Sequence, residues 1–293
     1  MKTKRILSIL LTMVLAFGLL VIMSVTAGAL APPASPATTT WDFDSTPADS
    51  SGSYGSGSWS WVQSTKTLIL TDITFTTSNR FALELPADAT IVLNGTNSIA
   101  STFSGASSTS GIYTNGNLTI NGSGSLSAAG GIVTGGYAAA GIFVATGTLT
   151  IESGTVNATG FDAGIDARSG LIINGGTVSA TGDYGIVVEQ QSSLSLTGGT
   201  FTAIGSSRAL FSKYTVPYGC KYYVNTTADP NLTERIGNGS TTKISTQKYA
   251  KVLYANETPP AVRGILGTSP KWDGAWWHFV LFFIGFGFFW MWF

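Results

Sequence analysis

The sequence predicts an all-β protein built as a parallel β-helix of about five coils. Two observations predict this fold: a repeat of about 22 residues between positions 111 and 205, and an alternation of apolar and polar residues inside each copy. The clearest copy runs from Gly164 to Gly182 and contains three short alternating segments separated by Gly, Asn and Ser. Three strands and three turns make one coil, and successive coils stack with parallel strands about 4.8 Å apart.

Apolar residues that recur at fixed places in the repeat predict the core. The columns are Ile112, Ile142, Ile165 and Ile186; Leu118, Leu149, Leu171 and Leu194; Ile120, Ile151, Ile173 and Leu196; Leu126, Val156, Val178 and Phe201; and Ala128, Ala158, Ala180 and Ala203. A fainter fifth copy includes Leu83 and residues 91–96. Because one coil buries only about five apolar side chains, each worth roughly 1.5–3 kcal/mol when large, no coil is stable alone.

The repeat is interrupted once and is expected to be closed at both ends. Residues 129–140, rich in Gly and Ala, predict a loop inserted between two coils. Residues 59–76 are expected to cap the N-terminal end, and the strand-like residues 208–224 and 241–254 the C-terminal end, because an open strand edge invites aggregation. The solenoid domain is therefore predicted over 59–255.

The N-terminal residues 1–31 predict a signal peptide or an uncleaved N-terminal anchor helix. A basic start precedes an uncharged apolar run over 6–25, and small residues suited to cleavage follow. Either interpretation exports the rest of the chain. Residues 32–58, rich in Pro, Ser, Thr and Ala, then predict a linker of low order.

The C-terminal residues 275–293 predict a transmembrane helix, which follows a short linker over 256–274. This segment carries no charge, and eleven of its nineteen residues are Trp or Phe. As a helix it spans about 28 Å, near the thickness of a hydrocarbon core. A buried hydrophobic segment of the globular part and a lipid-replaced tail are the alternatives. The expected location is thus the extracellular face of the cell membrane, at the cell surface.

Composition excludes several classes of function. Charged residues make up only 10% of the chain, against about 25% in an ordinary domain. The net charge is zero and no basic stripe is present, so we expect no nucleic-acid partner. The only histidine, His278, lies in the apolar C-terminal segment, which removes histidine-dependent triads and zinc sites from the exported domain. The single cysteine, Cys220, excludes an internal disulfide and is expected to be buried.

Acidic residues at one turn of the repeat are the candidate metal ligands. Asp162 and Asp183 occupy equivalent turns just before Gly-Ile on neighbouring coils. Two carboxylates one strand spacing apart, about 5 Å, are suited to hold Ca²⁺ with backbone carbonyls and water. The alternative is that each aspartate caps its turn by bonding its own backbone. No catalytic pair is predicted, because hydrolysis of sugars needs two close carboxylates and none recurs as a pair within one coil.

Arg168 is the one basic side chain that the repeat places near acidic groups. It stacks against Glu189 of the next coil, and a surface ion pair is expected there. Polysaccharide lyase chemistry would need a basic residue beside a calcium-held acidic sugar, and Arg168 near Asp166 is the candidate for that role.

Outward aromatic side chains are the candidate ligand-binding residues. Tyr113 and Phe143 share an outward column on adjacent coils, and Tyr184 lies at a turn of the repeat. Aromatic rings form a common platform for the apolar C–H faces of sugars. Together with Arg168, these three residues make up the candidate carbohydrate site. The alternative is lateral packing of the inserted loop, which contains Tyr137, onto the coil.

The motif Gly-Ile followed by Leu-x-Ile-Asn-Gly-Gly-Thr-Val-x-Ala-Thr-Gly resembles the repeat of exported pectate-lyase-like β-helix proteins of bacteria. Among these is a carbohydrate-binding β-helix family of surface proteins, and residues 59–70 are similar to the first strands of such modules. The resemblance covers about 59–254 and implies a right-handed solenoid that binds carbohydrate. It also implies calcium at an acidic turn before Gly-Ile, a position that Asp162 and Asp183 match, whereas the coils at Ser110 and Ala140 lack the acid.

The predicted function is therefore a membrane-tethered extracellular module that binds carbohydrate or acts as an adhesin. Its partner would be a cell-surface or extracellular polysaccharide, and Ca²⁺ is the only cofactor that the sequence suggests. A calcium-dependent polysaccharide lyase and a structural spacer with no small ligand are the alternatives.

Overall fold

The computed structural model describes residues 40–45, 48–136, 138–189, 193–212, 214, 220–227, 235–236 and 247–254. Within this part of the chain the protein is all-β, with a single turn of 3-10 helix, η1 (Gln63–Thr65). No helix in the same residues is long and apolar enough to cross a membrane. The predicted signal or anchor segment 1–31, the linker 256–274, the transmembrane segment 275–293 and His278 lie outside the described residues.

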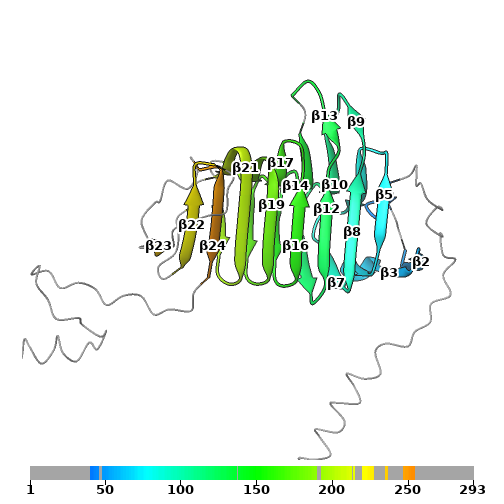
Figure 1. Cartoon of the computed structure of the whole chain (residues 1–293). Coiled ribbons are helices and arrows are strands. Elements are labelled where there is room, and N and C mark those ends of the chain that lie inside the picture. Colours follow the sequence, from blue (N-terminus) through cyan, green and yellow to red (C-terminus); the bar gives the residue numbers. More distant parts are fainter. Residues whose placement is uncertain are drawn as a thin grey trace, which may run out of the picture.

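Each coil consists of three strands, one on each of three faces. The first full coil contains β6 (Phe81–Leu85), β7 (Ala89–Asn94) and β8 (Thr96–Ser101). The next three contain β10 (Thr109–Thr114), β11 (Leu118–Gly122) and β12 (Ser125–Ala129); β14 (Ala139–Val144), β15 (Thr148–Ile151) and β16 (Thr155–Thr159); and β17 (Ala163–Ala167), β18 (Gly170–Ile173) and the first half of β19 (Thr177–Val187). The last contains the second half of β19, β20 (Ser193–Leu196) and the first half of β21 (Thr200–Phe211). The coils stack side by side (Figure 1), as the repeat predicts.

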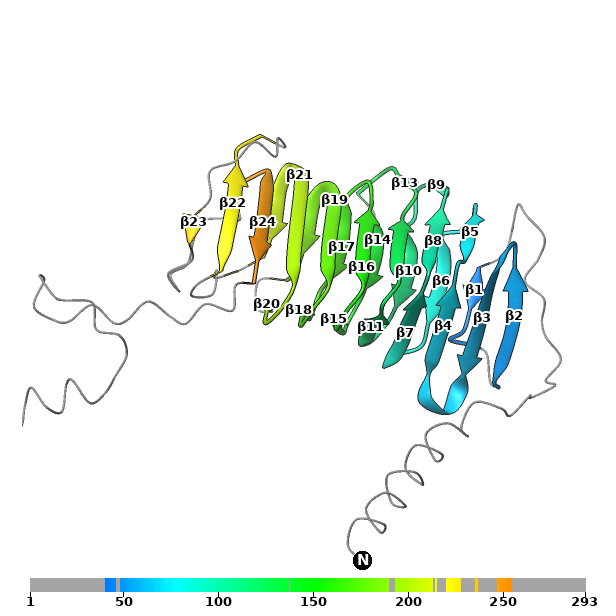
Figure 2. The same ribbon diagram turned by 60° about the horizontal axis from the view of Figure 1, so that its bottom comes forward.

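Three ladders of strands run along the stack. The first face has the order β1 (Trp41–Asp42), β6, β10, β14, β17 and the second half of β19. The second face has the order β2 (Ser50–Tyr54), β3 (Gly57–Val62), β4 (Thr67–Thr71), β7, β11, β15, β18 and β20, and its strands can be followed in Figure 2. The third face begins with β5 (Thr74–Thr77) and continues with β8, β12, β16, the first half of β19 and β21. Two short strands, β9 (Ser104–Gly105) and β13 (Ile132–Val133), pair with each other outside these ladders.

The core columns predicted from the repeat are confirmed by the strand register. Ile112 is paired with Ile142, Ile142 with Ile165, and Ile165 with Ile186. The leucine, valine and alanine columns pair in the same way along the second and third faces. Leu83 lies opposite Ile112, so the faint fifth copy is part of the same column. The interior is thus a set of apolar columns in which similar side chains stack coil upon coil.

The recurring Gly-Ile pair is explained by the corner between the third and first faces. A Cβ atom on Gly164 would lie 2.4 Å from the backbone nitrogen of Thr181 and 2.8 Å from the carbonyl oxygen of Ala158. Real Cβ atoms do not approach backbone atoms so closely, so only glycine fits there. At the Asn-Gly-Gly corner glycine is favoured for a further reason: Gly176 adopts a φ of +79°, in the left-handed region.

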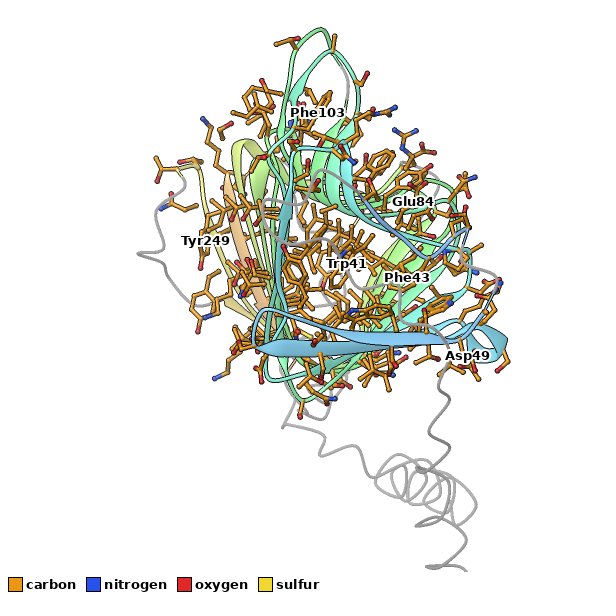
Figure 3. All side chains as sticks on the ribbon, turned by 90° about the vertical axis from the view of Figure 1, so that its right-hand side faces the viewer. Trp41, Phe43, Asp49, Glu84, Phe103 and Tyr249 are labelled. Carbon is orange, nitrogen blue, oxygen red and sulfur yellow. The ribbon has the colours of Figure 1, made fainter. Side chains whose placement is uncertain are left out.

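The N-terminal end of the stack is closed by reversed strands and a cluster of aromatic rings. β3 runs antiparallel to β4, and β2 antiparallel to β3. Trp41, Phe43 and Trp61 are all buried, and the Trp41 ring stacks on Phe75 at 4.6 Å between centroids. Figure 3, which looks along the stack, shows Trp41 and Phe43 inside the cross-section. Strands β1 and β2 lie within residues 32–58, the range whose composition predicts a linker, so the ordered domain begins earlier than residue 59.

The C-terminal end is closed in the same manner. β24 (Tyr249–Leu253) pairs antiparallel with β21, and β22 (Lys221–Asn225) pairs antiparallel with β24. β23 (Arg235–Ile236) pairs with β22. These strands prolong the third face beyond the last coil (Figure 1), and Cys220 is buried beneath them.

Candidate functional site

The outward positions of the first face differ in chemistry from those of the other two faces. Along the five coils, the second and third faces present mainly Ser, Thr and Asn to the solvent. The first face instead carries aromatic and charged side chains. The alternation of its strands explains their direction: Leu83, Ile112, Ile142 and Ile165 point inward, so the residue after each of them points outward.

One outward column therefore contains Glu84, Tyr113, Phe143 and Asp166 on four successive strands. The register pairs Glu84 with Tyr113, Tyr113 with Phe143, and Phe143 with Asp166. Figure 3 shows Glu84 on the outer side of the stack. The prediction that Tyr113 and Phe143 share a column on adjacent coils is thus confirmed.

The aromatic rings of this face form a continuous ladder with a guanidinium group at each end. The Phe81 and Tyr113 rings are stacked, with centroids 4.2 Å apart and planes 8° apart, and the Tyr113 and Phe143 centroids lie 5.6 Å apart. The Arg80 guanidinium lies 5.0 Å from the Phe81 centroid, and the Arg168 guanidinium 5.1 Å from the Phe143 centroid. We call these five residues the aromatic ladder. The Phe81 and Tyr113 rings cover each other's faces, whereas the Tyr113 and Phe143 planes are tilted by 59° and Phe143 is buried. A ligand on this surface therefore meets mainly ring edges and the two guanidinium groups.

Arg168 pairs with Asp166 and not with the expected Glu189. Its Nε atom lies 3.8 Å from Oδ2 of Asp166, whereas no ion pair joins Arg168 to Glu189 among the described residues. Only the backbones of these two residues are bonded, since the Glu189 amide donates to the Arg168 carbonyl. The guanidinium turns back over Phe143 toward Asp166, which combines a cation–π contact with a partly buried ion pair. The prediction of a surface Arg168–Glu189 pair is therefore wrong.

Asp166 is a buried carboxylate on an outward column. Only 7% of the residue is exposed, and its Oδ1 atom is buried without a hydrogen-bond partner. Burial raises the pKa of Asp166 to about 6, against the lowering effect of the neighbouring Arg168 guanidinium. Burial and the nearby Asp42 also raise the pKa of Glu84 on the same column. The first face thus holds two carboxyl groups that take up protons more readily than usual.

A second polar atom of this face also lacks a partner. The hydroxyl oxygen of Ser110 is buried and accepts or donates no hydrogen bond within the described part of the chain. Ser110 lies in register with Ala140 and Ala140 with Ala163, so small buried residues form a floor beside the aromatic ladder. Buried polar atoms without partners are uncommon and require an explanation such as a bound water or ligand.

The two turn aspartates bond to neighbouring coils, in opposite directions along the stack. Oδ2 of Asp162 accepts a 2.7 Å hydrogen bond from the Ala139 amide on the preceding coil. Oδ1 of Asp183 accepts hydrogen bonds of 2.5 and 2.6 Å from the Ser206 and Ser207 hydroxyls on the next one. Burial raises the pKa of Asp162, whereas these hydroxyls lower that of Asp183. Each carboxylate therefore caps an adjacent turn rather than its own backbone.

No cluster of three or more potential metal ligands occurs among the described residues. Asp162 and Asp183 remain close enough for the charge of one to raise the pKa of the other. A calcium ion held here would need backbone carbonyls and water for most of its six to eight ligands.

Tyr184 lies apart from the aromatic ladder. It is paired with Ala163 on one side and Arg208 on the other, and its ring contacts Phe211 at 5.5 Å between centroids. Tyr137 is outside the described residues. The structure thus brings Tyr113, Phe143 and Arg168 together and places Tyr184 further along the stack.

Three residues of this face escaped the sequence-based selection: Arg80, Phe81 and Glu84. The signal that identifies Glu84 is the alignment of Leu83 with Ile112, since Glu84 must then align with the outward Tyr113. Simple alternation would place Phe81 on the inner side with Leu83, so its stacking on Tyr113 could not be predicted in this way.

One family of known proteins matches the sequence of the solenoid. A family model described as "Carbohydrate-binding domain-containing protein" matches residues 52–257. Comparisons with curated proteins and with solved structures give no significant match.

Proposed function

The chain belongs to the family of carbohydrate-binding domain-containing proteins, and from this premise we propose that it binds a polysaccharide on the first face of its solenoid. The observation that supports this location is the aromatic ladder, whose side chains combine apolar surface with charged groups. Sugars offer both apolar C–H groups and hydroxyls, and their binding sites commonly combine apolar contact with a few polar partners.

Each part of the ladder has a distinct role in this proposal. The edges of Tyr113 and Phe143 contact the apolar side of the sugar ring. Arg168 donates hydrogen bonds to hydroxyl or carboxylate oxygens, for which its fork of donors is suited. Oδ1 of Asp166 and the hydroxyl of Ser110 supply the polar positions that have no partner in the protein. Tyr184 would extend the site toward the C-terminal coils.

The cellular setting is part of the proposal. An exported solenoid held at the cell surface by residues 275–293 would present its long faces to extracellular polysaccharide. The apolar, uncharged composition of that segment and the basic, apolar start of the chain support this arrangement. A right-handed, pectate-lyase-like coil is the form that the repeat motif resembles.

The Asp166–Arg168 pair is the observation that favours a second function, a calcium-dependent polysaccharide lyase. A carboxyl with a pKa of about 6 is suited to take up a proton near neutral pH. In such an enzyme Asp162 and Asp183 would hold Ca²⁺ against the acidic sugar. The burial of Asp166 weakens this alternative, because a substrate must reach the carboxylate through Arg168.

A glycan array with and without a calcium chelator separates the possible functions. Retention of a glycan without product supports the binding module, and an unsaturated sugar product supports the lyase. If neither retention nor product is observed, the protein is a structural spacer. We expect Tyr113→Ala and Arg168→Ala to weaken retention at least about tenfold, which corresponds to roughly 1.4 kcal/mol. Thr119→Ala, on the outward side of the second face, serves as the control and should retain the glycan. Equal retention by all three variants would place the ligand elsewhere.

A further inference from the structure

The third face carries a regular surface that the proposed sugar site does not use. Its central outward column, in strands β5, β8, β12, β16, β19 and β21, is uncharged and exposed or half-exposed; it consists of Thr74, Ser98, Ser127, Asn157, Ser179 and Thr202. We call this column and its outward neighbours on the same strands the hydroxyl face.

The hydroxyl face is regular in two directions. A second outward column, two residues earlier on the strands, consists of Thr96, Ser125, Thr155, Thr177 and Thr200. The register between neighbouring strands does not shift across either column. Neighbouring strands lie about 4.8 Å apart, and alternate residues along a strand about 6.7 Å apart. Figure 1 shows these strands side by side as one broad sheet.

The side chains of this face are almost all unbonded within the protein. Among the described residues, none of the hydroxyls of Ser98, Ser127 and Ser179 makes a side-chain hydrogen bond, and Thr202, which bonds Tyr249 at the capped end, is an exception. Strands β5, β8, β12 and β16 contain no charged residue and present no aromatic ring to the solvent. The surface therefore offers a grid of methyl groups and free hydroxyls.

Such a grid is suited to bind a flat, periodic partner whose molecules accept and donate hydrogen bonds, such as an ordered layer of water. A flexible sugar chain would leave most of the grid unused, and the planar rings that favour sugars lie on the first face. The oxygen atoms of hexagonal ice repeat in one direction at a spacing close to that between neighbouring strands. Hydroxyls ordered at such a spacing hold water in an ice-like arrangement, while the threonine methyl groups exclude disordered water. We propose that the hydroxyl face binds ice.

The size of the face matters as much as its chemistry. A single hydroxyl–water contact is weak, but the grid presents many such contacts on a rigid frame, so they act together without a separate ordering cost. The absence of charge on β5, β8, β12 and β16 supports the same partner, because a charged group keeps its own hydration shell and has no place in the ice lattice. The grid ends at β24, where Lys251 lies beside Thr202. The proposal requires exposure to external water, as the proposed export provides.

Incorporation of the purified full-length protein into a slowly growing ice hemisphere tests the proposal. We expect the wild-type chain to be enriched in the ice fraction and Ser179→Tyr to be excluded at least about fivefold, because a large ring lifts the ice from the grid. Asn157→Lys, a flexible and charged side chain at an exposed position, should act likewise. Glu84→Tyr, at a half-exposed outward position on the first face, adds a ring of the same size away from the grid; it is the control and should enter the ice as the wild type does.

Each outcome decides the matter. Exclusion of the wild-type chain from ice overturns the proposal, and so does incorporation of both Ser179→Tyr and Asn157→Lys at the wild-type level. Thermal unfolding shows whether a variant is folded, and if one of them is not, the other carries the comparison. Loss of polysaccharide retention in Ser179→Tyr, with no ice binding by the wild type, would assign the hydroxyl face to sugar instead.

Discussion

At the scale of the residue, the most informative group is the Asp166 carboxyl. It combines an outward position in the strand register with near-complete burial, a missing hydrogen bond at Oδ1 and a guanidinium neighbour. A buried carboxylate with one distant ion pair is costly to keep charged, and its raised pKa expresses that cost.

This raised pKa makes folding stability depend on pH. The folded state binds the Asp166 proton up to about pH 6, whereas the unfolded chain releases it near its ordinary value of 3.8. Stability is therefore expected to fall as the pH rises from about 4 to about 6 and to stay lower above that. We expect Asp166→Asn to flatten this part of the profile and to stabilise the protein at pH 7.5 by about 1–3 kcal/mol.

Urea unfolding at pH 4.5 and 7.5 measures the effect. Glu84 and Asp162 have pKa shifts in the same direction, so some slope should remain in the variant. A wild-type slope that survives unchanged in Asp166→Asn would show that this carboxyl is not the source. A loss of stability at both pH values would show that its ion pair with Arg168 is net stabilising.

At the scale of the element, each strand of a coil has one face in the core and one in water. β18 shows this most clearly, because Leu171 is fully buried and the adjacent Ile172 points outward. Both are large aliphatic residues, so their contributions to stability differ through burial alone.

We expect Leu171→Ala to destabilise the protein by about 2–5 kcal/mol, since it removes a core side chain between two stacked leucines and leaves a cavity. Ile172→Ala, the matched control, should change stability by no more than about 0.5 kcal/mol. Chemical denaturation of both variants provides the comparison. Similar losses in the two variants would contradict the inward–outward assignment of β18.

The elements also show what sequence patterns can predict. The core columns followed from the repeat because a coil places the same side chain at the same point in every copy. The strands β1 and β2 could not be predicted in this way, since they lie outside the repeat. β1 pairs with β6 and β2 with β3, and the rings of Trp41, Phe43 and Trp59 pack against one another. The partner of Arg168 was mistaken for a related reason: register gives the position of a residue, but burial and ring contacts decide where a long side chain turns.

At the scale of the whole molecule, the stack is a sum of interchangeable coils. Ile165 and Ile186 occupy the same column, so a coil can be removed by deleting the 21 residues from one such position to the next. The stability of such a protein depends on the intrinsic stability of each coil and on its interfaces with its neighbours.

We expect deletion of residues 164–184 to give a folded, shorter solenoid, because Ala163 then precedes Gly185 and the Gly-Ile phase is kept. Circular dichroism should show retained β-structure, and the urea m-value should fall because less surface is exposed on unfolding. Deletion of residues 164–173 breaks the phase and is the control, for which we expect loss of cooperative unfolding. A folded product from the second deletion alone would contradict the modular description.

The reversed strands at the two ends give this stack a further property. A stack of parallel coils has two different ends. Without caps, a second molecule can add to an end by stacking its own coils on it. Here β3 and β24 run opposite to the strands on which they pack. On one face at each end, therefore, an antiparallel strand interrupts the parallel ladder, and a coil added there would not stack directly on a strand of the repeat. The number of coils, and with it the length of the binding surface, is therefore set by the sequence. The capping strands oppose end-to-end association of the molecules into fibres.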